Sequence, residues 1–464
     1  MLEPTYQADV VVVGSGIAGL SAARRLTGAG VTTVVLEAAH TVGGRMTTEK
    51  VDGFRLDRVG QLLSTAYPEL RPAAGLDGLV LRPFAPGVLL HSDGRHHRAG
   101  VPAGAGGARG ALHVVRALAS APRAGAVPRR PAAVPGRQVS SPRSRTGAPL
   151  GTAVDQARLG AAFTRLAGTP VERLLSRPET TAAESLVARG LPARTVDGFL
   201  RPLLAALLCD PDLGTSSRCA DLALRAFAAG RLCLPEGGAE ALPELLARGL
   251  PPGTVRTGVR VTAVSTTSVT TAEHGEFRCR AVLVATDARA AARLLPGLRV
   301  PDFHPVTVVH HATDEPPRTG ASLLLDADRG GPVAHTAVVS RVDPSRAPTG
   351  RTLVSSTVLG PPGAQVDTDV RLHLSRLYGM PTARWQTLAV HHTADAVPAM
   401  PPPHDLRRPV RLLAGLYVCG DHRDTSTVQG ALHSGRRASA AILADLGAGR
   451  SLHRADPLPT VRAA

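Results

Sequence analysis

The chain is poor in lysine, aromatic residues and long apolar runs. Lys50 is its only lysine, and aromatic residues make up 3% of its 464 residues. No apolar run approaches the roughly 20 residues that a helix needs to cross a bilayer. Residues 1–5 lack the basic and apolar regions of a signal peptide. We therefore expect a cytoplasmic protein without a transmembrane segment, for which peripheral contact with a membrane stays open.

Cysteine is scarce as well, and no two cysteines form a C-x-x-C pair. The odd count of 5 argues against a disulfide framework and fits a reducing compartment. The adjacent histidine pairs are His96 and His97, His310 and His311, and His391 and His392. Neighbouring residues of a strand point to opposite faces, so such a pair does not chelate one ion easily. We expect no metal.

The charge is strongly positive, with a formal net charge of +16 at pH 7. The basic residues are almost all arginine, and they are scattered along the chain. A nucleic-acid-binding surface would gather them into a stripe, often with aromatic residues between. We therefore exclude a nucleic-acid partner, whereas an acidic substrate, an acidic redox partner or an anionic surface remains open.

A glycine motif near the start carries the first positive signal. Residues 10–13 are four valines, as a buried parallel strand requires, and Gly14, Gly16 and Gly19 follow as G-x-G-x-x-G. The first glycine permits a tight turn, the second lets the backbone approach a pyrophosphate, and the third lets helix pack on strand. The helix N-terminus then offers free N–H groups to phosphate.

A second strand is expected at residues 31–36, and Glu37 at its end can accept hydrogen bonds from ribose hydroxyls. NAD and FAD enzymes share this arrangement. Gly43, Gly44 and Arg45 favour FAD, because two glycines let the backbone pass close to a cofactor and arginine supplies donors for pyrophosphate.

The sequence near the other end of the chain is consistent with a flavin cofactor. Residues 416–419 predict a buried strand, which leads into Gly420 and Asp421 and then into a helix that ends near Gly447. An acidic residue at the end of a strand can hold a ribityl or ribose hydroxyl. The N-terminus of the following helix can stabilise negative charge on a reduced flavin ring. A nicotinamide enzyme has no use for this distant element, so we disfavour an NAD-linked dehydrogenase.

The pattern predicts an α/β protein with a Rossmann-like FAD-binding domain and a discontinuous α+β substrate domain. Residues 154–229 are helical in pattern, residues 255–286 predict an antiparallel meander, and residues 306–359 predict further strands. We assign residues 1–65, 230–300 and 405–464 to the FAD-binding domain and residues 66–229 and 301–404 to the substrate domain. Residues 120–152, rich in proline and arginine, predict a flexible loop.

Together these motifs resemble the flavin-containing amine oxidase superfamily, which includes amine oxidases, protoporphyrinogen oxidases and phytoene-desaturase-like enzymes. Besides the two ends, residues 57–61 resemble the strand that leads under the flavin. Residues 235–238 resemble the Pro-x-Gly-Gly turn of the family, and residues 282–287 resemble the strand that re-enters the cofactor domain. The resemblance covers most of the chain, but it names no substrate.

The resemblance implies a set of FAD contacts. Gly14, Ser15, Gly16, Ala18 and Gly19 would hold the diphosphate, with Gly43, Gly44 and Arg45 flanking it; Glu37 would hold the adenosine ribose and Val261 the adenine. Gly60 and Gln61 would lie near the isoalloxazine, Gly420 and Asp421 at the ribityl phosphate, and Gln429, Gly430 and Ala431 at the flavin pyrimidine.

The chain departs from the amine oxidases at one position. Many of them place a lysine beside the flavin, yet residues 305–311, where its strand is expected, contain none. The shortage of aromatic residues also leaves only Trp385 and Tyr378 as candidates for an amine-binding cage, and core packing is the simpler role for both. Desaturase-like and porphyrinogen-oxidase-like chemistry therefore becomes competitive.

The sequence predicts an FAD-dependent oxidoreductase that dehydrogenates an amine or a hydrophobic small molecule by hydride transfer to flavin N5. Electrons would pass to an acceptor such as oxygen or a quinone. No side chain is assigned as catalytic, because the cofactor performs the redox step. A flavin-binding scaffold or sensor without turnover is the alternative from another class.

Overall fold

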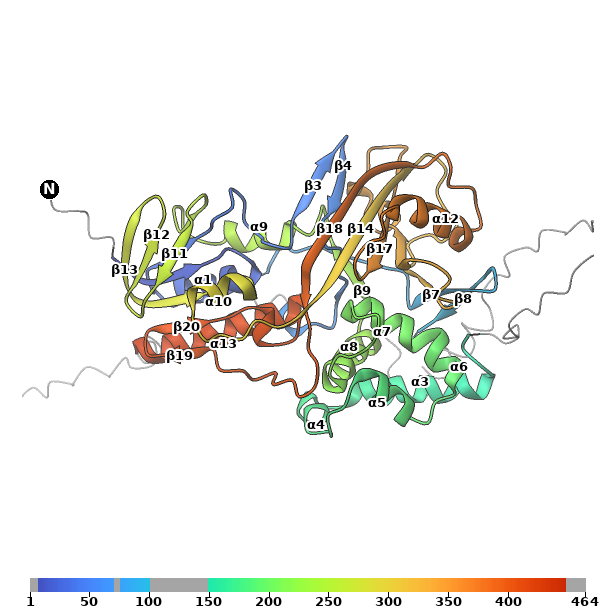
Figure 1. Cartoon of the computed structure of the whole chain (residues 1–464), viewed down its shortest axis with the longest axis horizontal. Coiled ribbons are helices and arrows are strands. Elements are labelled where there is room, and N and C mark those ends of the chain that lie inside the picture. Colours follow the sequence, from blue (N-terminus) through green and yellow to red (C-terminus); the bar gives the residue numbers. More distant parts are fainter. Residues whose placement is uncertain (1–6, 71–75, 101–148, 448–464) are drawn as a thin grey trace, which may run out of the picture.

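The computed structural model describes residues 7–70, 76–100 and 149–447. Figure 1 shows a sheet and its helices on the left, a second sheet at the upper right, and a group of helices at the lower right. The expected loop at residues 120–152 falls outside the described part from its start to residue 148. Within the described ranges, no helix combines the length and the apolar character that crossing a membrane would need.

The first sheet is eight-stranded, in the order β10-β2-β1-β13-β12-β11, with β20 beside β13 and β19 beside β20. Its strands are β1 (Gln7–Val13), β2 (Thr33–Leu36), β10 (Val255–Arg256), β11 (Val261–Val264), β12 (Ser268–Thr271), β13 (Gly275–Val284), β19 (Arg411–Leu413) and β20 (Leu416–Val418). β1, β2, β10, β13 and β20 run parallel. Val10, Val11 and Val12 are fully buried at its centre, because both faces of the sheet are covered.

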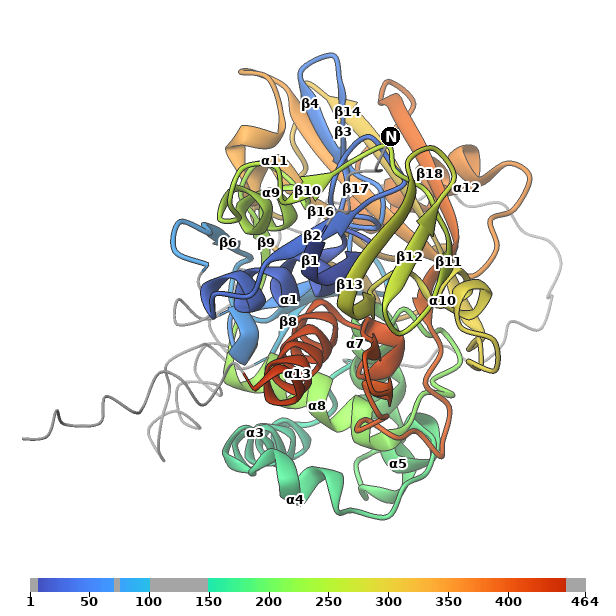
Figure 2. The same ribbon diagram turned by 90° about the vertical axis from the view of Figure 1, so that its left-hand side faces the viewer.

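Helices α1 (Ile17–Gly28), α9 (Ala241–Arg248) and α13 (Val428–Leu446) cover one face of this sheet, and α10 (Ala288–Leu294) packs on the other. Figure 2 shows α13 beneath β1 and α1. A Cβ at Gly435 would lie 2.4 Å from the carbonyl oxygen of Ala18. The two helices therefore approach closely only because a small residue stands at this point. The first and last described helices thus pack together.

The second sheet is seven-stranded and mostly antiparallel, in the order β18-β14-β17-β16-β15-β7-β8. Its strands are β7 (Val88–Ser92), β8 (Arg95–Ala99), β14 (Phe303–Thr313), β15 (Leu324–Asp326), β16 (Val333–Val338), β17 (Thr352–Leu359) and β18 (Gln386–Pro398). Helix α12 (Val366–Tyr378) covers one face, where Trp385 and Tyr378 are buried. These two rings, 5.8 Å apart, are core residues as expected.

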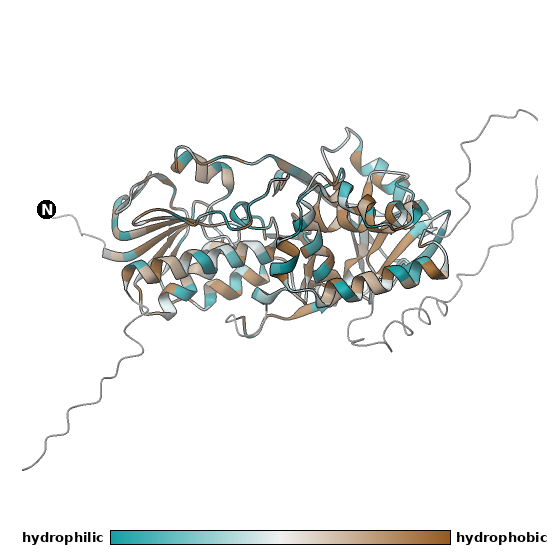
Figure 3. Ribbon diagram, turned by 90° about the horizontal axis from the view of Figure 1, so that it is seen from below, coloured by the Kyte–Doolittle hydropathy of each residue, from teal (hydrophilic) through white to brown (hydrophobic). Residues whose placement is uncertain are grey.

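A helical group covers the other side of the second sheet (Figure 1). It comprises α3 (Ala153–Gly168), α4 (Val171–Leu175), α5 (Ala182–Ala188), α6 (Ala193–Thr195), the π-helical turn η3 (Val196–Leu200), α7 (Arg201–Leu208) and α8 (Ser217–Ala229). Thr152 with Asp155, and Thr181 with Glu184, form capping boxes that start α3 and α5. In Figure 3, apolar residues predominate along the strands, whereas the helices carry both apolar and hydrophilic residues.

Short elements join these layers. They are β3 (Thr48–Val51), β4 (Phe54–Asp57), β5 (Leu63–Ser64), β6 (Leu81–Pro83), β9 (Leu232–Pro235), α11 (Val339–Val342), and the 3-10 turns η1 (Pro68–Leu70), η4 (Pro344–Arg346) and η5 (Asp421–Arg423). β3 pairs with β4, and β9 pairs with both β5 and β6. β4 and β9 both end where the two large sheets meet.

Candidate cofactor and substrate site

A cavity of about 650 Å³ lies at the carboxyl ends of the parallel strands. Its walls come from the turn after β1, the end of β2, residues 43–46, the start of β11, residues 285–287 after β13, and the start of α13. This is the place where open α/β sheets bind their ligands. Both ends of the chain therefore contribute to one binding site.

The glycine turn is shaped to admit a ligand. Gly14 has φ of +103°, and a Cβ there would lie 2.9 Å from the Ala285 carbonyl oxygen. A Cβ at Gly19 would lie 2.2 Å from the Gly14 carbonyl oxygen, so this glycine lets α1 pack against the turn. Gly16 differs, because a Cβ there would meet nothing within 4 Å and would project into the cavity. The open space at Gly16, at the N-terminus of α1, fits a phosphate.

Glu37 closes the cavity at the end of β2. One of its carboxylate oxygens accepts hydrogen bonds from the backbone N–H of Ser15 at 2.7 Å and from the Ser15 hydroxyl at 2.8 Å. The other oxygen accepts from the backbone N–H of Ala39 at 2.9 Å. These bonds fix the carboxylate beside the glycine turn, where its remaining lone pairs can accept hydrogen bonds from ribose hydroxyls.

Arg45 and Asp421 join the two ends of the chain. The guanidinium of Arg45 lies 2.7 Å from the Asp421 carboxylate and donates to the Ala396 carbonyl oxygen at 2.7 Å. Burial alone would raise the pKa of the Asp421 carboxyl, but the charge and hydrogen bond of Arg45, with help from His422, lower it below its ordinary value. The pair leaves a fixed cation and anion on the cavity wall.

The N-terminus of α13 faces the same cavity. Thr427 caps the helix by accepting a hydrogen bond from the backbone N–H of Gly430, and Thr427, Val428 and Ala431 line the wall. A Cβ at Gly430 would lie 2.0 Å from the Thr425 carbonyl oxygen, so the tight entry to the helix requires glycine. The positive end of the helix dipole is therefore directed at the ligand space.

The structure brings most of the expected site residues together. Twelve of the seventeen line the large cavity: Gly14, Gly16, Ala18, Glu37, Gly43, Gly44, Arg45, Gln61, Val261, Gly420, Asp421 and Ala431. Ser15 in the first turn, Gly19 in α1, and Gln429 and Gly430 in α13 do not line it, and Gly60 lines a second cavity.

Two glutamines of the expected set bond to neighbouring segments of the protein. The Gln61 side chain donates to the Ser426 carbonyl oxygen at 2.9 Å, which ties the segment after β4 to the entry of α13. The Gln429 side chain accepts from the backbone N–H of Glu69 at 3.0 Å and lies outside the lining. Gln61 thus joins the first and last parts of the site.

A second, smaller cavity of about 40 Å³ adjoins the large one, since Asp57 and Leu234 line both. Its walls include Gly60, His310 and His335, and neither Glu37 nor Val261 contributes. It therefore lies at the end of the large cavity away from the end of β2. This second cavity is the candidate for the substrate side of the site.

The one lysine lies outside both cavities. Lys50 sits on β3 with its side chain 63% exposed, 3.4 Å from Glu240. On β14, Val308 and His310 are the residues that line the second cavity. No lysine is among the described residues that line the two cavities.

Sequence reasoning left several lining residues without a role. Thr286, Asp287, Ala290 and Arg293, which follow β13, line the large cavity. Asp57 at the end of β4 lines it too. The sequence did offer a signal for them, because both segments lie at or just after the end of a strand. Strand ends commonly meet at the ligand site of an α/β sheet.

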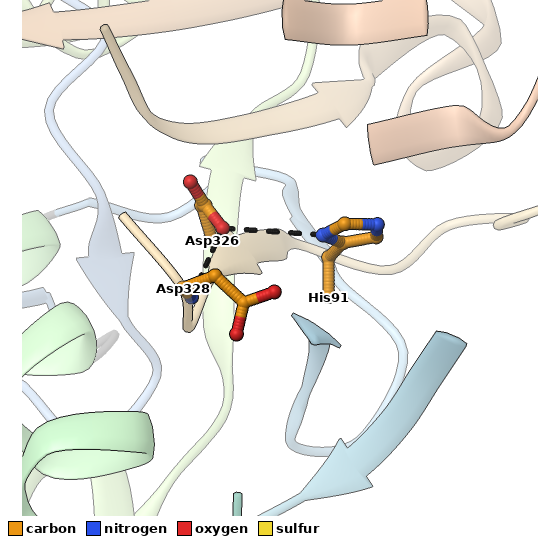
Figure 4. Close-up of side chains that lie close together, drawn as sticks. All are labelled: His91, Asp326 and Asp328. Carbon is orange, nitrogen blue, oxygen red and sulfur yellow. Dashed lines mark hydrogen bonds and ion pairs between the residues drawn. The ribbon is translucent and has the colours of Figure 1, made fainter. Parts of the chain in front are cut away.

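A histidine–carboxylate cluster lies elsewhere, at the rim of the second sheet. Figure 4 shows His91, Asp326 and Asp328, whose possible ligand atoms lie within 4.8 Å of one another. Asp326 accepts hydrogen bonds from the backbone N–H groups of Asp328 and Gly330, and Asp328 accepts from Ser92 and from the backbone of Asp93. These bonds explain the carboxylates as turn-forming groups that join β7 to the end of β15.

Solved structures of several enzymes share the fold. Putrescine oxidase bound to putrescine superposes with a TM-score of 0.66 at 19% identity, covering 95% of this chain and 100% of that one. A putative protoporphyrinogen oxidase from Exiguobacterium gives a TM-score of 0.65 at 18% identity, over 96% of this chain and 99% of the other. At these identities the likeness concerns the fold alone.

Curated relatives match over shorter stretches. Putrescine oxidase from Kocuria rosea is 44% identical over 100 residues, and a putative flavin-containing monoamine oxidase from Mycobacterium tuberculosis is 38% identical over 93 residues. The matched segments cover about a fifth of the length of this chain and of those relatives. Residues 17–443 match the family described as flavin containing amine oxidoreductase. The chain belongs to this family of FAD-dependent oxidoreductases.

Proposed function

We propose that this protein binds one FAD along the large cavity and dehydrogenates an amine or a hydrophobic small molecule held in the second cavity. The observation that carries the proposal is the contact between the two cavities at Asp57 and Leu234. In this arrangement the adenosine lies toward Glu37 and Val261. The isoalloxazine lies toward Gln61 and Ala431, next to the second cavity.

Bound flavin supplies an acceptor, at N5, for a hydride from a C–H bond of the substrate. The protein holds and orients both partners and excludes water. The N-terminus of α13 and the Arg45 guanidinium favour negative charge on the cofactor. The walls of the second cavity, which include Leu62, Phe84 and Leu323, keep the reacting end of the substrate out of solvent.

The division into domains follows from this proposal. Residues 1–65, 230–300 and 405–464 would form the cofactor domain, and residues 66–229 and 301–404 the substrate domain. The first sheet lies in the former and the second sheet in the latter, and the separate three-stranded sheet β5-β9-β6 contains strands from both.

A desaturase-like or porphyrinogen-oxidase-like reaction is the second candidate. The specific observation in its favour concerns the lining of the second cavity. Val308 and His310 line it from β14, and none of its described lining residues is a lysine. Dehydrogenation of a carbon–carbon bond within a hydrophobic substrate does not call for the lysine that many amine oxidases place beside the flavin.

The test is anaerobic mixing of the purified, flavin-loaded protein with amines, polyenes and porphyrinogens. Bleaching of the flavin by one class, followed by recovery with oxygen or a quinone, supports an oxidoreductase of that substrate class. A flavin that is photoreducible and reoxidisable but is bleached by no substrate class supports a binding scaffold without turnover instead.

A further inference from the structure

The floor of the second cavity is one face of the second sheet. In this sheet β17 lies between β14 and β16 and pairs with both. The ladder pairs Val308 with Thr357 and Thr357 with His335 in one row, and His310 with Ser355 in the next. All five line the cavity. Since alternate residues of a strand share a face, the register alone brings two histidines and two hydroxyls to this floor.

His310 is fully engaged with the protein. Its Nε2 lies 3.0 Å from the Asp57 carbonyl oxygen and therefore donates, while its Nδ1 accepts from the Ser355 hydroxyl at 2.8 Å. Burial lowers the pKa of His310 to about 4, so the ring is neutral at physiological pH. Its role is to hold the end of β4 against the sheet.

His335 differs, because its ring finds no hydrogen-bond partner among the described residues. The residue is 6% exposed, and its Nδ1 is buried and unpaired. Burial lowers the pKa of His335 to about 4, which keeps this imidazole neutral as well. A buried polar atom without a partner costs free energy unless a ligand or a water satisfies it. The unpaired ring therefore marks a place where a polar group can dock.

The charges around this floor disfavour a cation. Arg55 and Arg346 line the second cavity, and Asp57 is the one carboxylate among the described lining residues. The Asp57 carboxylate already pairs with Arg346 at 2.9 Å and accepts from the Thr48 hydroxyl and the backbone N–H of Ala239, each at 2.8 Å. No carboxylate is free there to neutralise an ammonium group, which would pay a desolvation cost without a counter-ion.

We propose that the second cavity is a specificity pocket, in which His335, beside Thr357, binds an uncharged hydrogen-bonding group of the substrate, such as a hydroxyl or carbonyl, and which rejects protonated amines. This inference rests on the proposed function, because it places the substrate in the second cavity. It narrows the substrate class to molecules that are neutral at the end facing the sheet.

The test compares isobutanol with isobutylammonium, two molecules of similar shape that differ in charge. Binding to the flavin-loaded protein at pH 7 is read from perturbation of the flavin absorption spectrum, without turnover. We expect isobutanol to bind at least about tenfold more tightly than isobutylammonium. His335→Leu should weaken isobutanol binding about tenfold, as loss of one hydrogen bond predicts. His335→Asn should restore part of it.

His304→Leu is the matched control, because His304 lies on β14 but lines neither cavity. It should leave both affinities unchanged. Equal or tighter binding of isobutylammonium, unaltered isobutanol binding in His335→Leu, or no response to either molecule would overturn the inference. Failure of the purified protein to bind FAD would instead defeat the proposed function, so the two failures are distinct.

Discussion

At the scale of single residues, the three glycines of the first turn perform different tasks. Gly14 and Gly19 allow the protein to pack against itself, since a Cβ at either would press on backbone atoms. Gly16 keeps space open for a ligand. The sequence motif predicts separate roles for the three glycines, and the Cβ distances in the structure agree with that division between folding and ligand space.

Gly16→Val should fold normally and lose FAD. The φ of Gly16 is −67°, which valine adopts, and its Cβ would meet nothing within 4 Å in the protein. Its branched side chain would occupy the space proposed for phosphate. Flavin absorbance after purification and the melting temperature, measured without added flavin, check both parts.

The matched variant is Gly19→Ala, whose Cβ would lie 2.2 Å from the Gly14 carbonyl oxygen. It should lower the melting temperature of the flavin-free protein. Full flavin loading of Gly16→Val, or unchanged stability of Gly19→Ala, would contradict the separate roles.

Asp421→Asn should reduce stability in a pH-dependent way. The pKa of Asp421 lies below its ordinary 3.8 in the folded protein, so its stabilisation is present above pH 4 and is lost as the pH falls through the folded value. Because Arg45 is one third exposed, we expect the substitution to lower the free energy of unfolding at neutral pH by only roughly 1–3 kcal/mol.

Thermal unfolding of both proteins between pH 3 and pH 7 checks this. The difference in melting temperature between wild type and Asp421→Asn should be large at neutral pH and small in acid. A difference in melting temperature that stays constant across this pH range would show that the carboxylate charge is not what stabilises the fold.

At the scale of elements, the docking of α13 on α1 holds the two ends of the chain together. Gly435→Ala should weaken it, because the added Cβ would lie 2.4 Å from the Ala18 carbonyl oxygen. We expect a loss of about 1–3 kcal/mol, as overpacking of a core costs, together with weaker FAD binding. Denaturant unfolding and FAD titration measure the two effects.

Gly28→Ala is the control on the same pair of helices. Gly28 ends α1, and a Cβ there meets nothing within 4 Å. Alanine should leave stability unchanged or raise it by about 0.5–1 kcal/mol. Equal effects of the two substitutions would show that the contact with Ala18 is not limiting.

The elements also show what the sequence could predict. β1, α1, β13, β20 and α13 follow from local signals, because valine runs, glycine spacing and strand ends lie within short stretches of chain. The predicted strand at residues 31–36 forms from Thr33. The pairing of Arg45 with Asp421, 376 residues apart, requires the folded sheet and could not be read locally.

The floor of the second cavity was beyond prediction for the same reason. His310, His335 and Thr357 come from three strands whose register is a tertiary property. Each alone looks like an ordinary strand residue. Only the assembled sheet shows that the ring of His310 has hydrogen-bond partners in the protein, whereas the buried Nδ1 of His335 has none among the described residues.

At the scale of the whole molecule, two sheets meet at a junction that contains both cavities. The first sheet contributes strand ends and helix N-termini, which suit a phosphate-bearing cofactor. The second contributes a floor of neutral polar groups, which suits a substrate. The chain passes between them several times, so the site depends on the complete fold.

The central claim is that the two ends of the chain form one site for a single FAD. Titration of the flavin-stripped protein with FAD, followed by the quenching of flavin fluorescence and by absorption, tests it most directly. The account predicts saturation at one FAD per chain and the spectrum of a bound oxidised flavin. A protein that is purified colourless, folds cooperatively and binds no added FAD would contradict it.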